Sequence, residues 1–438
     1  MYQRKDGIVD FDGDRCIGCK ACMQACPYDS IYIDPDEGTA AKCHFCAHRT
    51  EVGLEPACVI VCPEHAIIAG DLSDPSSEVA QLVAREPVRV RKPEQGTVPK
   101  LFYIDGDESA IVPTAARHEP FYMWSQRNAA LHGGGALYPE NSPLLQKNAV
   151  AAYDVGHARP WGWQVPAYSW TKSIASGALA IPAIAVALGK LPANRMRDIA
   201  LATVALLFTV LTTVLLVWDL DHPERFLRVV FMAQKRSWLS RGAFILMTYS
   251  TLCGLFWLAA VAGFSAATSV LLWPLVLSGF AAAAYTAFLF GQCEGRDLWQ
   301  TPLLPAHLIV QALFCGAAVL ALLPDSLGGS KQATSLAALA LILGVGLHML
   351  MLLGEVLMPH TTDNSRYAAR LMTHGPFARA FWGGGVVLGG VIPLLLLAVF
   401  VFGVAGHLLV GIAGILALIG LLIFEWCFVM AGQSVPNS

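Results

Sequence analysis

Eight long apolar segments in the second part of this 438-residue chain constrain its fold more than any other feature. Each is close to the roughly 20 residues that an α-helix needs to cross the hydrocarbon of a bilayer. Their predicted limits are 166–188, 199–220, 243–264, 270–290, 303–323, 333–357, 383–403 and 408–431. The sequence therefore predicts an all-α integral membrane domain of eight transmembrane helices.

The first part of the chain differs, because residues 1–160 carry most of the charged side chains. Only 14% of all residues are charged, against about 25% in typical soluble domains. A net charge of −3 gives no electrostatic support for binding nucleic acid, so no such partner is expected. No apolar segment follows the polar N-terminal residues, so no secretory signal peptide is expected.

Eight of the twelve cysteines lie between residues 16 and 62, in two sets that each end before a proline. The first set has the spacing of bacterial ferredoxins, and the second lengthens only its middle gap. The sets are Cys16-x2-Cys19-x2-Cys22-x3-Cys26-Pro27 and Cys43-x2-Cys46-x11-Cys58-x3-Cys62-Pro63. Zinc is the alternative interpretation, since Cys-x2-Cys pairs also build zinc sites, but the triple repeat favours iron–sulfur clusters.

Eight thiolates at four per cube predict two [4Fe–4S] clusters. In two-cluster ferredoxins the fourth cysteine of each set binds the other cluster. On that crosswise rule one cluster binds Cys16, Cys19, Cys22 and Cys62, and the other binds Cys43, Cys46, Cys58 and Cys26. Short apolar runs at 30–33 and 66–69 predict the strands of an α+β ferredoxin-like head.

The head resembles the iron–sulfur subunits of the dimethyl sulfoxide and polysulfide reductases. The resemblance rests on the Cys-Ile-Gly-Cys-Lys-Ala-Cys-Met-Gln-Ala-Cys-Pro-Tyr run at 16–28, on Lys-Cys-His-Phe-Cys-Ala-His-Arg at 42–49 and on Pro-Ala-Cys-Val-Ile-Val-Cys-Pro at 56–63. It extends to about residue 104. Those subunits usually carry four cysteine sets, and this sequence has two.

These limits divide the chain into a 2[4Fe–4S] head at 1–104, a linker at 105–160 and a membrane domain at 161–438. The linker mixes charge, proline, glycine and aromatic residues without a clear period. An aromatic group that includes Trp161 begins the membrane domain, and such residues are typical of the membrane interface.

Loop charges predict the orientation of the membrane domain. Nine basic residues occupy the loops on the side of the head: Arg225, Arg228, Lys235, Arg236, Arg241, Arg296, Arg366, Arg370 and Arg379. Four occupy the opposite side: Lys190, Arg195, Arg197 and Lys331. We therefore predict an inner-membrane protein with the head and both termini in the cytoplasm.

Ionisable residues within spans are costly in lipid, so they indicate function. Lys172, Asp219, His307 and Glu355 lie toward the head side of their spans and are the candidates for quinone and proton binding. His348 is expected deeper, about 15 Å from the interface at roughly 1.5 Å per residue. Because the two buried histidines are then at different depths, we expect no haem.

The membrane domain resembles the NrfD-type membrane subunits of polysulfide reductases. The matching segments are Trp-Asp-Leu-Asp-His-Pro-Glu-Arg-Phe at 218–226, Arg-Ser-Trp-Leu-Ser-Arg-Gly at 236–242 and Trp-Gln-Thr-Pro-Leu-Leu-Pro at 299–305. The resemblance implies exchange of electrons with quinone without haem, and a separate catalytic subunit carrying molybdenum or tungsten bis-pterin.

The sequence thus predicts an electron-transfer and membrane-anchor subunit of a quinone-linked oxidoreductase complex. Membrane lipid, quinone and a catalytic subunit on the cytoplasmic side are the expected partners, and no catalytic residues are expected in this protein. No Gly-x-Gly-x-x-Gly motif follows a predicted strand. A ferredoxin-coupled ion pump or transporter, and a membrane-anchored redox sensor, remain alternatives.

Overall fold

The computed structural model describes residues 1–112, 159–403, 407–435 and 437. The chain forms two compact units, of which the first comprises residues 1–67 and 160–435 and the second residues 68–159 and 436–438. All eight cysteines of the two sets therefore belong to the same unit as the apolar helices. The predicted linker at 105–160 falls largely on residues 113–158, outside the described part of the chain.

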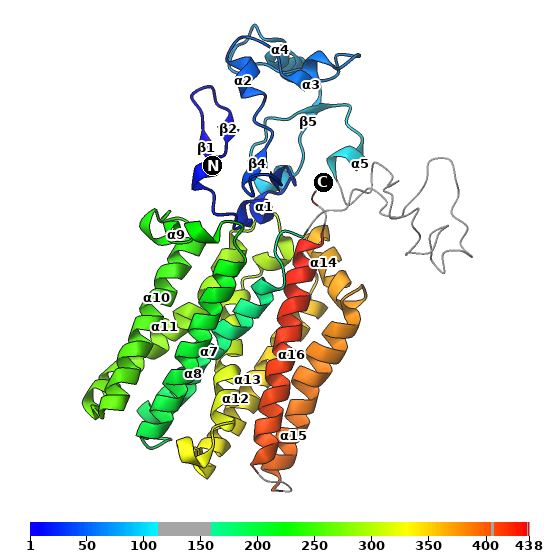
Figure 1. The fold of residues 1–438 in the computed structure, drawn as a ribbon. Coiled ribbons are helices and arrows are strands. Elements are labelled where there is room, and N and C mark those ends of the chain that lie inside the picture. Colours follow the sequence, from blue (N-terminus) through cyan, green and yellow to red (C-terminus); the bar gives the residue numbers. More distant parts are fainter. Residues whose placement is uncertain (113–158, 404–406, 436, 438) are drawn as a thin grey trace, which may run out of the picture. The chain divides into compact units, whose positions relative to one another are not determined.

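Eight helices of the described residues are long and apolar enough to cross a membrane, which confirms the eight predicted spans (Figure 1). They are α7 (Gln164–Ala187), α8 (Arg195–Trp218), α10 (Trp238–Ala262), α11 (Ser265–Gly291), α12 (Leu304–Ala321), α13 (Lys331–Leu357), a π-helical stretch (Ala380–Val391) continued by α15 (Ile392–Val401), and α16 (Leu408–Gln433).

Small residues allow these helices to approach closely, as expected where lipid offers no hydrophobic drive for association. One such close approach joins α7 to α12. A Cβ atom at Gly177 would collide with the carbonyl oxygen of Ala312, and one at Gly316 would collide with the carbonyl oxygen of Gly177. Two glycines facing each other thus fix the spacing of the two helices.

The first 67 residues contain only short elements. Strand β1 (Tyr2–Gln3) pairs with β2 (Val9–Asp10), and β3 (Ile31–Ile33) pairs with β4 (Ala40–Lys42), both antiparallel. The helices are α1 (Ala21–Ala25), α2 (Ala47–Thr50) and α3 (Ala57–Ile60).

One predicted strand is wrong. The run at 30–33 contributes β3, but the run at 66–69 is not a strand and β3 pairs with β4 instead. The Ala66 amide donates to the sulfur of Cys62 at 3.1 Å, so it is not free to join a sheet ladder. The hydrogen bond to the cysteine sulfur takes the place of the strand pairing that the local propensity predicts.

Short helices follow the transmembrane helices at the end that meets the first cysteine set. They are α9 (Arg228–Phe231), which lies between α8 and α10, and α14 (Asp363–Thr373).

The second unit contains α4 (Glu78–Arg85), capped at its N-terminus by the Ser77 hydroxyl, and α5 (Glu108–Ile111). Its strands β5 (Val88–Arg89) and β6 (Tyr103–Ile104) pair antiparallel.

Replacing Gly177 with valine is expected to destabilise the membrane domain, because the new side chain would overlap the Ala312 carbonyl. Overpacking of this kind costs about 1–3 kcal/mol or more. Gly346→Val is the matched control, because a Cβ atom at that helical glycine meets nothing within 4 Å. Thermal unfolding in detergent measures the difference, and equal melting temperatures for the two variants would contradict the packing described.

Candidate functional site

The loop of the first cysteine set is held by side chains from the ends of the transmembrane helices. Arg225 donates through Nη1 to the carbonyl oxygens of Gly13 at 3.0 Å and Cys16 at 2.9 Å. The indole nitrogen of Trp161 donates to the carbonyl oxygen of Cys19 at 3.0 Å. The membrane domain thus binds the backbone of two cysteines directly.

Backbone contacts bring the same loop still closer to residues 221–222. The amides of Asp221 and His222 donate to the carbonyl oxygens of Gly18 at 3.4 Å and Ile17 at 3.3 Å. Gly18 has φ +68°, and a Cβ atom there would lie 2.5 Å from the Cβ atom of Asp221. Glycine is therefore required for both the backbone conformation and the close approach.

A chain of hydrogen bonds between buried side chains continues this contact from Gln24, a residue of α1. Gln24, which is fully buried, accepts from Arg296 Nε at 2.6 Å and donates to Gln433 Oε1 at 2.9 Å. Gln433 in turn donates to the Trp161 carbonyl at 2.7 Å. Trp161 is itself buried and stacks on Trp299. The location of its aromatic group at the membrane interface stays a prediction.

The sulfur atoms of the cysteines accept hydrogen bonds from backbone amides. Cys16 Sγ accepts from Gly18 and from Ala40, both at 3.4 Å. The amides around residues 64–67 point toward Cys62, and those of Ala66 and Ile67 lower the pKa of its thiol most. Such bonds favour the thiolate, which is the form that binds iron.

Cys16, Cys19 and Cys22 lie close enough to one another to interact electrostatically. Burial, together with the smaller effect of the neighbouring Cys19 and Cys16, raises the pKa of the Cys22 thiol to about 12. Thiols in such a setting ionise only when a cation compensates their charge. This donor set fits an iron–sulfur cluster, which would supply that positive charge.

The second set is more open, since Cys43 and Cys58 are exposed. No group of three or more His, Cys, Asp or Glu side chains in the described residues lies close enough to hold one metal ion. A cube does not need such convergence, because its four thiolates bind four different iron atoms. The eight free thiols of the two sets are enough for two clusters, and their crosswise pairing stays a prediction.

Two histidines meet inside the membrane domain. His307 Nε2 on α12 lies 2.6 Å from His348 Nδ1 on α13, and both side chains are buried. The prediction that they lie at different depths is therefore wrong. His307 is near the start of α12, whereas His348 is well before the end of α13, so α13 extends past α12 toward the head-binding end. The absence of haem stays a prediction.

Carboxyl and amide groups surround the histidine pair. Glu355 Oε1 on α13 lies 3.9 Å from His307 Nδ1. Glu355, Gln311 and Glu425 each have a buried Oε1 atom without a hydrogen-bond partner in the described residues. Buried acceptors without partners are costly, so they indicate a place where a ligand or water donates.

Lys172 on α7 joins this group through Glu425. The ammonium donates to the hydroxyl of Thr286 and lies 4.6 Å from the ring centre of Tyr285, both on α11. It also interacts electrostatically with Glu425 on α16, which is near enough to Glu355 for the two carboxyls to interact. Four helices thus direct their ionisable groups to one region.

Asp219 stands apart from that cluster, one residue beyond the end of α8. Its carbonyl accepts from Lys20 at 3.3 Å. Burial raises the pKa of its carboxyl to about 7, against the opposing effect of the Lys20 ammonium. The buried Tyr168 lies within electrostatic range of both Asp219 and Glu425. The structure therefore brings three of the four predicted candidates together and places Asp219 where the cysteine loop is bound.

The four candidates chosen from the sequence did not include Gln311, Glu425 or His348, although Glu425 and His348 are ionisable residues within predicted spans. Gln311 follows His307 by four residues, so helical spacing places both on one face of α12 and could have indicated it. Glu425 was recognisable as a carboxyl within a span. The partnership of His348 with His307 had no signal in the sequence, because it depends on how far α13 extends past α12.

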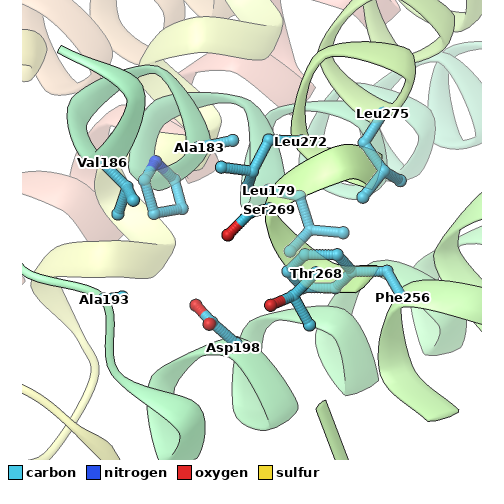
Figure 2. Close-up of a pocket in the computed structure, with 11 residues that line it drawn as sticks. Leu179, Ala183, Val186, Ala193, Asp198, Phe256, Thr268, Ser269, Leu272 and Leu275 are labelled. Carbon is cyan, nitrogen blue, oxygen red and sulfur yellow. The ribbon is translucent and has the colours of Figure 1, made fainter. Parts of the chain in front are cut away.

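A small cavity lies near the other end of α7. Its lining includes Leu179, Pro182, Phe256, Asp198 and Ser269. Figure 2 shows the Asp198 carboxyl and the Ser269 hydroxyl turned toward its interior. None of the predicted candidates lines this cavity.

The sequence matches two family models. Residues 153–437 match the family described as polysulphide reductase, NrfD, and residues 1–72 match the 4Fe-4S dicluster domain. The first match covers well over half of the chain and contains all eight apolar helices. The dicluster match implies two iron–sulfur clusters.

Similar proteins match the N-terminal part. A tetrathionate reductase subunit of Salmonella typhimurium is 46% identical over 127 residues, which cover 28% of this chain and 50% of the relative. A polysulfide reductase chain of Wolinella succinogenes is 43% identical over 111 residues, covering 25% and 58%. The protein NrfC of Escherichia coli is 44% identical over 99 residues, covering 22% and 44%. The matches span about half the length of these relatives.

Replacing Arg225 with glutamine is expected to loosen the loop of the first cysteine set. The change removes two charge-assisted hydrogen bonds to carbonyl oxygens, each worth about 1.5–3 kcal/mol. Hydrogen exchange at the amides of residues 16–18 should become tenfold faster or more. Lys190→Gln, a change at an exposed cation at the opposite ends of the helices, is the control and should leave these amides protected.

Iron content tests the crosswise pairing. Two cubes give about eight irons per molecule. Cys16→Ser combined with Cys62→Ser should remove one cluster and leave about four irons, whereas Cys16→Ser with Cys26→Ser should remove both. Cys315→Ser, at a buried cysteine of α12, is the control and should leave all the iron. The reverse result for the two double variants would show that each set builds its own cluster.

Proposed function

From the premise that the protein belongs to the polysulphide reductase NrfD family and carries a 4Fe-4S dicluster domain, we propose that it relays electrons between a catalytic subunit and membrane quinone. Trp161, which donates to the Cys19 carbonyl, directly precedes α7, the helix that carries Lys172. Arg296 and Gln433, which bind Gln24 of α1, lie just before α12 and at the end of α16, the helices of His307 and Glu425. These contacts support the proposal, because they join the first cysteine set to the helices whose buried groups can exchange protons.

The buried cluster has the chemistry that a quinone needs. A quinone ring requires a hydrogen-bond donor at each carbonyl oxygen, and its reduction to quinol takes up two electrons and two protons. Imidazole and ammonium groups donate hydrogen bonds, and carboxyl groups accept and release protons. The unpartnered oxygens of Glu355 and Glu425 suit the hydroxyl groups of a quinol, which would donate to them.

Iron–sulfur clusters carry single electrons when bound, so the two electrons of a quinol would pass one at a time. The residues of this protein position the loop of the first set, exclude water with Trp161 and Trp299, and hold protons at His307 and Glu355. Lys172 and Asp219 are the other proton-binding candidates.

The remaining assignments follow from the same proposal. The second cysteine set, with Cys43 and Cys58 exposed, is the side that would face the partner subunit. The relatives are subunits named after tetrathionate and polysulfide reductases, which supports a separate catalytic partner. The resemblance of the membrane domain implies that this partner carries molybdenum or tungsten bis-pterin. The excess of basic residues in the loops on the head side favours a cytoplasmic head in an inner membrane.

Electron paramagnetic resonance on the purified protein reduced with dithionite tests the proposal. We expect signals from two interacting reduced clusters that disappear when a short-chain quinone is added. If the signals of both reduced clusters persist after quinone is added, the result would contradict the proposal and favour a redox sensor. Turnover that depends on an ion gradient would favour a pump or transporter, and zinc without iron would refute the account of the head.

Replacing His307 or Glu355 is expected to slow quinone reduction without removing iron. Removing a positioned proton donor or acceptor typically costs about 10²–10⁴-fold in rate. Stopped-flow absorbance of the reduced clusters after mixing with quinone measures the rate for His307→Gln and Glu355→Gln. His407→Gln, at the opposite ends of the helices, is the control and should react like the unchanged protein.

A further inference from the structure

The segment between α8 and α10 exposes an unusual number of large apolar side chains. Phe231 and Met232 are 80% and 71% exposed, and Leu227 and Phe226 are 50% and 37% exposed. All four lie in or beside the short helix α9. Side chains of this size are rarely left in water together unless another surface covers them.

The same segment carries cations without acidic neighbours. Residues 226–241 contain no aspartate or glutamate. Lys235, Arg236 and Arg241 are exposed, and none of them forms an ion pair with the described residues. The Arg241 guanidinium lies 4.9 Å from the ring centre of Trp238, and its Nε donates to the Lys235 carbonyl at 2.7 Å. We call residues 226–241 the basic apolar segment.

The position of this segment identifies what covers it. It ends in the first turn of α10, a helix long and apolar enough to cross a membrane, whose side chains Phe244 and Met247 are 44% and 48% exposed. Figure 1 shows α9 at the end of α10 that lies nearest to the N-terminal elements. The segment is therefore continuous with the lipid-covered surface, at the level where apolar tails give way to headgroups.

We propose that the basic apolar segment is a binding site for anionic phospholipid. Phe231 and Met232 enter the boundary of the acyl chains, as the apolar face of an interfacial helix does. Lys235, Arg236 and Arg241 pair with the phosphate and the other anionic groups of the headgroup. Charge complementarity selects anionic over zwitterionic lipid, because no carboxylate within the segment competes for the three cations.

Lipid bound at this site would also affect the hydrogen bonds that hold the loop of the first cysteine set. Arg225 and Arg228 adjoin or belong to the segment, and they donate to the carbonyl oxygens of Cys16 and Asp14. A lipid that fixes α9 and the following turn restrains these two arginines. The order of the cysteine loop then depends on the lipid around the protein.

Lipid titration of the full-length protein in detergent, read by native mass spectrometry, tests the proposal. The probes are phosphatidylglycerol and phosphatidylcholine with identical acyl chains. Lys235→Gln combined with Arg236→Gln should weaken phosphatidylglycerol binding about 30-fold, as expected for two basic residues at an anionic surface. Phosphatidylcholine binding should change little.

Lys190→Gln combined with Lys331→Gln is the matched control, because these are two exposed cations at the opposite ends of the helices. This double variant should leave the affinity of the basic apolar segment for phosphatidylglycerol unchanged. Equal losses in the two double variants, or no loss in either, would overturn the proposal. If the Lys235 and Arg236 double variant does not elute as one folded species, Lys235→Gln alone should give about a fivefold loss, as expected for one basic residue.

Two further arms distinguish a lipid from a free anion. Phe231→Ser combined with Met232→Ser should weaken binding of both lipids, since it removes the apolar part of the site. Inorganic phosphate at millimolar concentration should not displace phosphatidylglycerol. Complete displacement by phosphate, with no effect of the Phe231 and Met232 changes, would show a site for a free anion and refute the lipid assignment.

Discussion

Hydrogen bonds from membrane-domain donors to the carbonyl oxygens of the first cysteine loop are the interaction on which the rest of the structure depends. Arg225, Trp161 and the amides of residues 221–222 satisfy this loop, whose backbone is too irregular to satisfy itself. The loop therefore has a fixed place on the helix ends. Without these donors the clusters and the intramembrane polar groups would have no defined relation to each other.

The arrangement of the buried polar groups follows from the low polarity of their surroundings. A single ionisable side chain at the centre of a span costs about 2.5–3.5 kcal/mol on insertion scales. Gathering His307, His348, Glu355 and Glu425 lets each reduce the penalty of the others through hydrogen bonds and opposite charge, with Lys172 as the cation. The oxygens that still lack partners are the groups left to act on a ligand.

Local patterns predicted much of this protein, and long-range packing decided what they missed. The eight spans followed from apolar length, because a helix in lipid must satisfy its own backbone. The strand expected at 66–69 failed because Cys62 takes the Ala66 amide. The indole of Trp161 donates to the Cys19 carbonyl and its ring stacks on Trp299, and no local pattern predicts these contacts.

The sequence by itself determined the two cysteine sets, the helical membrane domain and the residue types able to exchange protons, because each depends on spacing or composition within a short stretch. Only the tertiary structure decided that His307 meets His348, that Glu425 and Gln311 complete their group and that Asp219 lies beside the cysteine loop. These contacts depend on how far each helix extends past its neighbours. That offset is set by the packing of whole helices, such as Gly177 against Gly316, which no local pattern encodes.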